Sequence, residues 1–361
     1  MNWETLHWPT LDRLREKFLR GAASAESYWE TDADLASYDL TYAERIGWKW
    51  DHVLRELRLR AWRPRARTVL DWGCGSGIAA RRVIEFFGAE NFSELTVWDR
   101  SPLACDFAAR AARAAFPALR VVEATPNFLT AAVASPALSS ELSTLSSPTS
   151  DAEPIGLLVI SHVLNELPPA ALDALLLLAR RAEHVLWVEP GTHAASRALG
   201  AVRENLRADF SVVAPCTHHD ACPVLAPANH RHWCHAFAPP PPAIYADPNW
   251  VRFAQRAGID LRSLPYAFLA LDRQPPSDAA GLSRVIGRPE FFKPYARLLN
   301  CDATGLAELE LPKRADPALF KQLERTKAPL VFRWRRDGEK ILGGTALALP
   351  DSAPQSSAES P

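Results

Sequence analysis

The chain of 361 residues is 48% hydrophobic and 23% charged, a composition typical of a globular protein with a substantial buried core. Its formal net charge of −1 excludes an overall electrostatic field that would attract polyanions. The first residues mix acidic and basic side chains, and no apolar run approaches the thickness of a bilayer. The sequence therefore indicates neither a secretory signal nor a membrane partner, and we expect a cytoplasmic location.

Residues 1–66 are predicted to form a helical N-terminal region. Apolar residues recur there at three- and four-residue spacing, as in LDRLREKFLR and YAERIGWKWDHVLRELRLRAW. The end of this region is basic, and its arginines are Arg55, Arg58, Arg60, Arg63, Arg65 and Arg67. Such a stretch can bind RNA, and it fits a solvated helix face equally well.

Short apolar runs alternate with helical segments from Thr68 onward. The predicted strands are 68–73, 94–99, 119–124, 155–163, 184–191 and 210–215, and the predicted helices are 77–88, 102–115 and 168–182. This alternation predicts an α/β fold in which helices cover both faces of a parallel sheet. We assign residues 67–273 to this domain, including a further strand at 264–273.

Two segments interrupt the alternating pattern. Residues 131–153 are rich in Ser and Ala and nearly free of large apolar side chains, which predicts a disordered insertion. Residues 216–247 are rich in Cys, His and Pro and show no periodicity. We interpret this second segment as a metal-binding insertion, for reasons given below.

The C-terminal part is predicted to be a small, β-rich, basic module over residues 280–349. The runs LVFRWRR and KILGG flank Asp337-Gly338, which is a strong hairpin signal. Residues 312–340 carry nine Lys or Arg against four Asp or Glu, so this stretch is a second candidate for RNA binding. Residues 350–361 are predicted to be a disordered tail.

A glycine-rich turn follows the first predicted strand. It contains Asp71, Gly73, Gly75 and Gly77 in the order D-x-G-x-G-x-G, and glycines at these positions let the backbone turn sharply beside a ligand. The next strand ends at Asp99, whose carboxylate could hold two ribose hydroxyls, while Asp71 could accept a hydrogen bond from a cationic amino group. Together these features resemble the first motif and the partner acid of class I S-adenosylmethionine-dependent methyltransferases.

The fourth predicted strand ends in Ser161-His162-Val163-Leu164-Asn165-Glu166. In this fold such a position lies beside the methyl donor, so His162 is a candidate general base and Asn165 and Glu166 are candidates for orienting the acceptor. Asn165 and Glu166 could instead cap the following helix. The strand lacks both an Asn/Asp-Pro-Pro-aromatic motif and a catalytic Pro-Cys, and Cys216 is not predicted to be a methyl-transfer nucleophile.

Cysteines cluster in the second half of the chain. Cys216, Cys222 and Cys234 lie within nineteen residues, and metal ligation would give this Pro- and His-rich loop the order that burial cannot. Cys301 is the candidate fourth ligand, because Cys74 and Cys105 belong to the α/β domain. Four thiolates suit an iron–sulfur cluster or a tetrahedral zinc ion. The neighbouring histidines, at positions 218, 219, 230, 232 and 235, leave a Cys3His zinc site open.

Taken in order, D-x-G-x-G-x-G, HVLNEL, EPG, PCTHHDACP, HWCHAF and LPYAFLAL resemble the ribosomal small-subunit methyltransferase-like family of bacterial proteins and mitochondrial small-subunit assembly factors. The resemblance covers roughly residues 30–340. It implies a Rossmann-like domain that binds S-adenosylmethionine and associates with the small ribosomal subunit and its rRNA. It also implies a [4Fe–4S] cluster on Cys216, Cys222, Cys234 and Cys301.

Three functions follow from these features. The first is an enzyme that methylates ribosomal RNA or a ribosomal protein. The second is a non-catalytic ribosome assembly factor that binds small-subunit RNA through the same fold. The third is a zinc-bearing methyltransferase that acts on a small molecule.

Overall fold

The computed structural model describes residues 3–20, 29–124, 155–275 and 281–348. The predicted insertion at 131–153 and the predicted tail at 350–361 lie outside these ranges. Within the described ranges, no helix is both long enough and apolar enough to span a membrane.

The N-terminal part is helical, as the spacing of its apolar residues predicts. After a short turn, η1 (Trp3–Thr5), it forms α1 (Trp8–Arg20), α2 (Asp32–Tyr38), the π-helical turn η2 (Asp39–Ala43) and α3 (Glu44–Leu59). A capping box starts α2, because Thr31 Oγ1 accepts the Asp34 N–H and the Asp34 carboxylate accepts the Thr31 N–H. The buried face of α3, with Trp50, Leu54 and Leu57 fully enclosed, packs against the sheet.

The central sheet contains all seven strands predicted from the sequence. They are β1 (Thr68–Trp72), β2 (Glu94–Trp98), β3 (Arg120–Glu123), β4 (Ile155–Ser161), β5 (Ala182–Pro190), β6 (Ser211–Ala214) and β8 (Leu264–Asp272). Their order is β3-β2-β1-β4-β5-β8-β6, and the short β7 (Ala236–Ala238) pairs with β8. The expectation of a purely parallel sheet is wrong at one strand, since β8 runs antiparallel to β5, β6 and β7.

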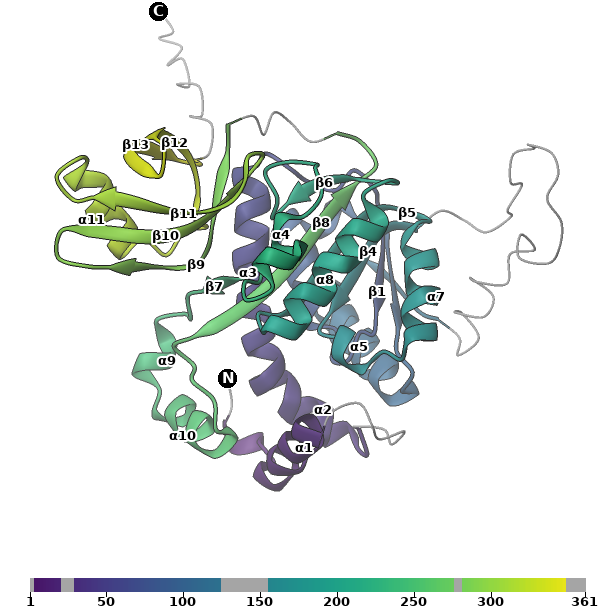
Figure 1. Ribbon diagram of the computed structural model, residues 1–361. Coiled ribbons are helices and arrows are strands. Elements are labelled where there is room, and N and C mark those ends of the chain that lie inside the picture. The colour runs from purple at the N-terminus through teal and green to yellow at the C-terminus, as the bar shows by residue number, and fades with distance from the viewer. Residues whose placement is uncertain (1–2, 21–28, 125–154, 276–280, 349–361) are drawn as a thin grey trace, which may run out of the picture.

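Helices cover both faces of the sheet (Figure 1). They are α4 (Ile78–Phe87), α5 (Pro102–Ala115), α7 (Pro169–Ala179) and α8 (His193–Leu206). Neighbouring strand residues point to opposite faces, so Leu157 packs in the core with α3, α4 and α5 whereas Leu158 packs in the core with α7 and α8. Strands buried on both sides are apolar without alternation, which is why the sequence IGLLVIS of β4 predicts a strand.

The cysteine-rich segment between β6 and β8 is built mainly of turns. It contains the 3-10 turns η6 (Pro223–Leu225) and η7 (Pro227–Asn229), then β7, the short helix α9 (Ala243–Ala246) and α10 (Pro248–Ala257). The amphipathic α10 returns to the N-terminal helices, where Trp250 meets Trp3 edge-on at 5.0 Å between ring centroids.

The C-terminal part closes into a five-stranded barrel in the order β10-β11-β13-β12-β9. Its elements are β9 (Ser283–Phe291), β10 (Tyr295–Asp302), β11 (Gly305–Pro312), α11 (Pro317–Arg325), β12 (Val331–Asp337) and β13 (Lys340–Ala346). The predicted hairpin is present, with Asp337 paired to Lys340 across a turn in which Gly338 has a φ of 56°. The barrel has its own apolar core, in which Phe332 and Leu309 are buried.

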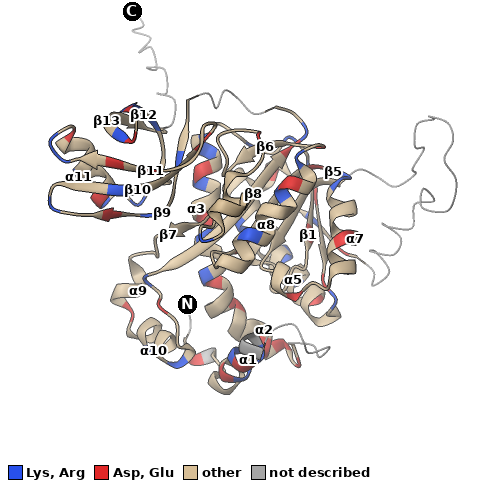
Figure 2. Ribbon diagram, in the orientation of Figure 1, with Lys and Arg blue, Asp and Glu red and all other residues tan. Residues whose placement is uncertain are grey.

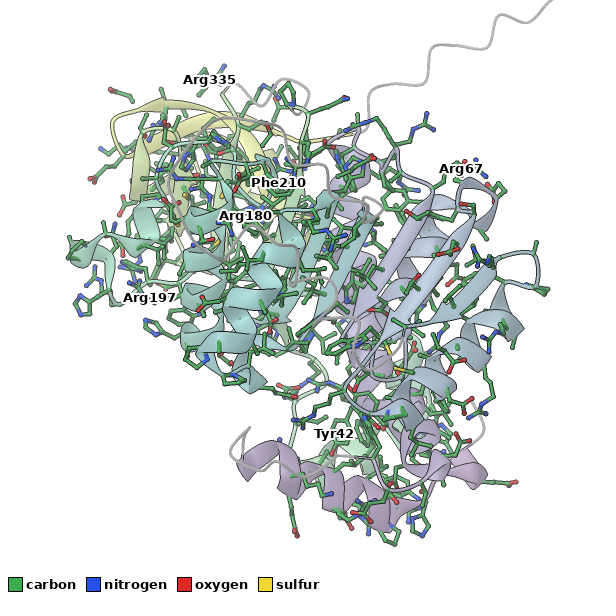
Figure 3. All side chains as sticks on the ribbon, turned by 90° about the vertical axis from the view of Figure 1, so that its right-hand side faces the viewer. Tyr42, Arg67, Arg180, Arg197, Phe210 and Arg335 are labelled. Atoms are coloured by element: carbon green, nitrogen blue, oxygen red, sulfur yellow. The ribbon has the colours of Figure 1, made fainter. Side chains whose placement is uncertain are left out.

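Acidic and basic residues are interspersed over the ribbon (Figure 2), in keeping with the small net charge. Only some side chains of the predicted basic stretches are exposed to solvent. Arg67 and Arg335 are exposed and lie at the outer edge of the molecule (Figure 3), whereas the side chain of Arg60 is only 6% exposed.

Candidate active site and cysteine centre

The glycine turn after β1 has the left-handed backbone that its sequence predicts. Gly73, Gly75 and Gly77 have φ values of 70°, 52° and 78°, a region that other residues enter only at a cost. A Cβ on Gly77 would lie 2.9 Å from the Cβ of Ala108, so this glycine also lets α4 and α5 approach each other. A Cβ on Gly75 would meet nothing within 4 Å, because this part of the turn borders a cavity.

The acid at the end of β2 holds this turn. Asp99 accepts the Gly75 N–H at 3.0 Å through Oδ2 and the Ser101 N–H at 2.9 Å through Oδ1. Burial raises the pKa of Asp99, and these two backbone hydrogen bonds oppose that effect. Asp71 lies deeper, where burial raises its pKa to about 7 and a hydrogen bond from the backbone of Ala80 opposes the rise.

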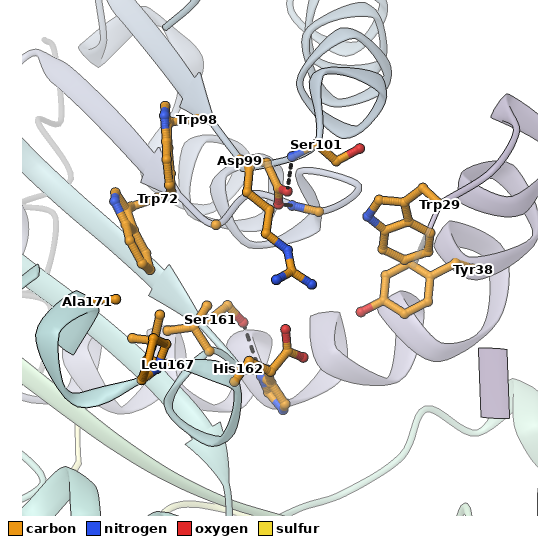
Figure 4. A pocket seen from close by; sticks show the side chains of 16 residues that line it. Trp29, Tyr38, Trp72, Trp98, Asp99, Ser101, Ser161, His162, Leu167 and Ala171 are labelled. Atoms are coloured by element: carbon orange, nitrogen blue, oxygen red, sulfur yellow. Dashed lines mark hydrogen bonds between the residues drawn. The ribbon is translucent and has the colours of Figure 1, made fainter. Parts of the chain in front are cut away.

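A cavity of about 310 Å³ opens beside the turn, at the carboxyl ends of β1, β2 and β4 (Figure 4). Trp72 and Trp98 stack along one side with ring centroids 5.0 Å apart, and Trp29 and Tyr38 of the N-terminal region lie on the other side. Its other lining residues are Gly73, Gly75, Asp99, Arg100, Ser101, Ser161, His162, Val163, Glu166, Leu167, Pro168 and Ala171. The cavity thus combines flat aromatic faces with a few polar groups, which is typical of small-molecule sites.

The residues predicted for this site divide into two groups. Gly73, Gly75, Asp99, His162 and Glu166 line the cavity. The remaining three, Asp71, Gly77 and Asn165, do not line it, and Asn165 is exposed.

The alternative interpretation of Asn165 and Glu166 as helix caps is wrong. Both belong to the 3-10 turn η5 (Leu164–Glu166), and the N-cap of α7 is Pro168. Neither side chain therefore caps α7.

The end of β4 forms a polar chain that the sequence did not reveal. His162 has a φ of 57°, unusual for a residue with a side chain. Its Nδ1 lies 3.1 Å from Ser161 Oγ and its Nε2 lies 3.0 Å from the Nζ of Lys49 on α3. Trp50 Nε1 donates to the same Ser161 Oγ at 3.0 Å. Lys49 was missed because an isolated lysine in an amphipathic helix is indistinguishable from a surface residue by sequence alone.

A buried carboxylate supports the loop after β4. Glu189 at the end of β5 accepts the backbone N–H groups of Val163 and Leu164 at 3.1 and 3.2 Å and the indole N–H of Trp187 at 2.7 Å. Burial raises the pKa of Glu189 to about 7 in spite of these hydrogen bonds. Glu189 therefore fixes the backbone that carries His162 into the cavity.

The fold brings the four candidate metal ligands near enough to one another for their charges to interact. Cys216 follows β6, Cys222 precedes η6, Cys234 precedes β7 and Cys301 lies in β10 of the barrel. Burial raises the pKa of the Cys222 and Cys301 thiols, and the charge of the nearby Cys216 sulfur raises it further. The same two causes, in the same order, raise the pKa of Cys234 to about 12. All four thiols are free of disulfides.

Buried cations and donors surround these thiols. Arg60 donates to the carbonyl of Cys216 at 3.1 Å, and Arg284 is the cross-strand neighbour of Cys301. Among the described residues, three buried polar atoms have no hydrogen-bond partner here: Arg203 Nε, Thr217 Oγ1 and His218 Nδ1. Buried donors without partners are costly, and this environment suits an anionic group held by the thiolates.

The same residues are not arranged around a single ion. Within the described ranges, no three His, Cys, Asp or Glu side chains lie close enough together to share one metal ion. Of the predicted alternative ligands, His218 lies beside Cys301, with Nε2 3.9 Å from the sulfur. His219 instead contacts the carbonyl of Arg207 at 3.0 Å, and His235 contacts that of Trp233 at 3.0 Å.

The strand order, the single antiparallel strand β8 and the glycine turn with its partner acid define a Rossmann-like domain of the class I methyltransferase type. The chain belongs to the family described as mitochondrial small ribosomal subunit Rsm22, whose model matches residues 50–326. This match confirms the family resemblance seen in the motifs. No curated relative matches the sequence.

Solved structures with a similar fold are distant. Magnesium protoporphyrin IX methyltransferase from Synechocystis, solved with bound S-adenosylmethionine, is 12% identical, and the alignment covers 73% of this chain and 97% of that one at a TM-score of 0.37. An O-methyltransferase family protein from Burkholderia thailandensis is 17% identical, with 75% and 70% covered and a TM-score of 0.36. A methyltransferase from Aquifex aeolicus is 16% identical, with 51% and 90% covered and a TM-score of 0.34. Likenesses this remote do not bear on function.

Proposed function

We propose that this chain binds S-adenosylmethionine in the cavity beside the glycine turn and transfers its methyl group to a component of the small ribosomal subunit. The observation that supports this most is the meeting of three features in one cavity: the left-handed glycine turn, the Asp99 carboxylate and the polar end of β4. Ligands of open α/β sheets bind at this edge, outside the carboxyl ends of the strands.

The lining residues suggest how the cofactor would be held. Asp99 has lone pairs beyond those used by Gly75 and Ser101 and would accept ribose hydroxyls. The indoles of Trp72 and Trp98 offer flat apolar surface for an adenine ring. Asp71, which lies below the turn, would act by holding the start of α4 rather than by touching the cofactor.

A direct test is calorimetric titration of the purified chain with S-adenosylmethionine, followed by incubation with methyl-labelled cofactor and immature small subunits. Binding together with label in rRNA or in a ribosomal protein would support the methyltransferase. Binding without label transfer would favour the non-catalytic assembly factor, for which the exposed Arg333 and Arg335 of the barrel are candidate RNA contacts. A chain that binds no cofactor would contradict the methyltransferase and leave the non-catalytic assembly factor.

We further propose that Cys216, Cys222, Cys234 and Cys301 hold an iron–sulfur cluster of the [4Fe–4S] type. A single zinc ion requires thiolates within about 3.8 Å of one another, given zinc–sulfur bonds of about 2.3 Å, and no such group is preformed among the described residues. A four-iron cluster separates its ligands further, and its sulfides would accept hydrogen bonds from the unpartnered donors of Arg203 and Thr217. When bound, it would supply a cross-link between the Rossmann-like domain and the barrel and a centre able to exchange electrons.

Metal analysis after anaerobic purification tests this centre. We expect iron and sulfide in the wild type and in Cys105→Ala, and their loss in Cys301→Ala. Stoichiometric zinc in a colourless protein would contradict the cluster and support a zinc site instead. Iron retained by Cys301→Ala would remove this cysteine from the ligand set.

The family description names the mitochondrial small ribosomal subunit, and we propose the small subunit and its rRNA as partners of this chain. The mitochondrial matrix thereby joins the cytoplasm as an expected location, and we propose the compartment in which that subunit is assembled. Co-sedimentation with immature small subunits tests the partner, and affinity should fall steeply with salt if phosphates are contacted.

A further inference from the structure

We propose that Lys49, His162 and Ser161 form a relay that takes the proton from the methyl acceptor and delivers it to the amine of Lys49. This inference rests on the proposed methyltransferase function and adds a proton acceptor to it. Three linked contacts support it: Lys49 Nζ to His162 Nε2 at 3.0 Å, His162 Nδ1 to Ser161 Oγ at 3.1 Å, and Ser161 on the cavity wall.

Lys49 is an unusual lysine. Its side chain lies on α3 behind His162 and the residue is 7% exposed. Within the described part of the chain no carboxylate pairs with its ammonium, and its Nζ lies in hydrogen-bond distance of His162 Nε2. Burying an unpaired charge is costly, so such a lysine gives up its proton readily. Burial, then the charge of Arg45, lower the pKa of Lys49 to about 7.

His162 is held so that its two ring nitrogens work together. Burial, then the charges of Lys49 and Arg45, keep its pKa well below the ordinary value, so the imidazole is neutral. A neutral imidazole has one donor and one acceptor nitrogen. When Lys49 is a neutral amine it can accept from Nε2–H, and Nδ1 then accepts from the Ser161 hydroxyl. When Lys49 is protonated it donates to Nε2, and Nδ1–H donates to Ser161 instead.

The strained backbone of His162 gives this arrangement its geometry. A φ of 57° in a residue with a side chain is sparsely populated and persists only when the surroundings enforce it. The surroundings are the Glu189 carboxylate, which accepts the next two backbone N–H groups, and the Val188 carbonyl, which accepts the His162 N–H at 2.8 Å. Trp50 also holds Ser161 by donating to its Oγ.

The proton transfer balances without any further reactant. A nitrogen or oxygen of the acceptor forms a bond to the methyl carbon with its lone pair, the carbon–sulfur bond breaks, and its electrons return to the sulfur. The acceptor then loses a proton to Ser161 Oγ, the Ser161 proton passes to His162 Nδ1, and the Nε2 proton passes to Lys49, which becomes an ammonium. Both nitrogens of His162 are used inside the relay, so the residue predicted from the sequence as a general base acts here as a proton carrier.

The charged groups around the relay set its response to pH. Arg45 on the same helix favours the neutral amine of Lys49, Glu189 on β5 opposes it, and His162, directly after β4, is neutral. Methyl transfer by the wild type should therefore increase with pH through a midpoint near 7, because only the neutral amine can accept the proton.

The test is the rate of label transfer to immature small subunits as a function of pH. For Lys49→Met we expect a loss of about 10²-fold or more, the usual contribution of general base catalysis, with no midpoint near 7 and with cofactor affinity unchanged by calorimetry. Arg120→Met, at the start of β3 where the arginine side chain is 74% exposed, should retain the wild-type rate and pH profile. If Lys49→Met does not fold, Ser161→Ala should lose the rate and the pH response while Ser161→Thr, which keeps the hydroxyl, restores both.

The outcomes separate the relay from the function on which it rests. Wild-type rates and pH profiles in Lys49→Met or in Ser161→Ala would overturn the relay and leave the methyltransferase intact. A wild type that transfers no label would overturn the methyltransferase, and the relay would fall with it.

Discussion

Asp99 at the end of β2 accepts the backbone N–H of Gly75 at 3.0 Å, so the acid of one strand holds the glycine turn of its neighbour. The same side chain lines the cavity beside that turn. One carboxylate therefore orders the turn and also faces the cavity, and substitutions can separate these two roles.

Asp99→Ala removes both roles and should weaken S-adenosylmethionine binding by more than about tenfold, since a charged hydrogen bond contributes about 1.5–3 kcal/mol. Asp99→Asn keeps an oxygen for the Gly75 N–H and should lose less affinity. Calorimetric titration of both variants measures the difference. Equal losses would mean that the charge, rather than the order of the turn, decides binding.

Two glycines of the same turn should respond differently to alanine. Gly77→Ala places a Cβ 2.9 Å from that of Ala108 at a φ of 78°, so the strain adds to a clash with α5, and we expect about 2–4 kcal/mol of lost stability. Gly75→Ala meets no atom within 4 Å and should lose about 1–2 kcal/mol, but its methyl group enters the cavity and should weaken cofactor binding. Urea unfolding and calorimetry of both variants test this contrast. A Gly77→Ala variant as stable as the wild type would show that α4 and α5 can move apart to accommodate the methyl group.

The strands of the Rossmann-like domain could be predicted because their apolar runs are buried on both faces, as in Leu157 and Leu158 of β4. The direction of β8 could not, because LPYAFLALD reads the same in a parallel and an antiparallel strand. The barrel was predicted only at its β12–β13 hairpin, where Asp337-Gly338 marks the turn. Its closure through β9 depends on contacts between segments far apart in the chain.

The site shows a similar limit. Gly75 and Asp99 were recognisable because a left-handed turn and a partner acid leave a local signature in the sequence. Lys49 lies 113 residues from His162 in the chain, and nothing near it distinguishes a buried lysine from a solvated one. Arg203 is likewise inconspicuous in α8, although its buried guanidinium lies beside the cysteines.

Arg203 should stabilise an anionic centre on the cysteines. Its buried Nε has no partner among the described residues, and its Nη2 donates to the carbonyl of His218 at 3.2 Å. Arg203→Met should lose bound iron faster in air than the wild type. Arg207→Met is the matched control, because Arg207 also contacts Glu204 but is 37% exposed. Iron content and visible absorbance over time measure the difference, and identical decay in both variants would contradict the role.

Glu56 joins α3 to the barrel by an ion cluster. This fully buried carboxylate pairs with Arg60 at 2.9 Å and with Arg284 of β9, and both arginines donate to the carbonyl of Pro215. Glu56→Ala removes the carboxylate that two buried guanidinium groups share and should cost about 3–5 kcal/mol. Glu44→Ala breaks the more exposed pair with Arg82 and should cost less than about 1 kcal/mol. Urea unfolding measures the loss of stability in both variants. Equal losses would show that the buried ion cluster stabilises the chain no more than the more exposed pair does.

Glu189 should make the free energy of unfolding depend on pH, and the substitution Glu189→Gln should remove that dependence. Burial raises its folded-state pKa to about 7 from an ordinary value of 4.5. Between these values the folded chain holds a proton that the unfolded chain has released. The contribution to stability is therefore complete below pH 4.5 and is lost as the pH rises through 7, by about 3 kcal/mol in all.

Glu189→Gln keeps an oxygen for the Val163, Leu164 and Trp187 donors but cannot ionise, so its stability should fall less than that of the wild type between pH 5 and 8. Glu183→Gln, at an exposed position of the same strand, is the matched control and should follow the wild type. The measurement is the free energy of unfolding in urea at several pH values. Parallel curves for Glu189→Gln and the wild type would mean that Glu189 stays ionised in the folded chain, and that the loop carrying His162 is held by a charged carboxylate.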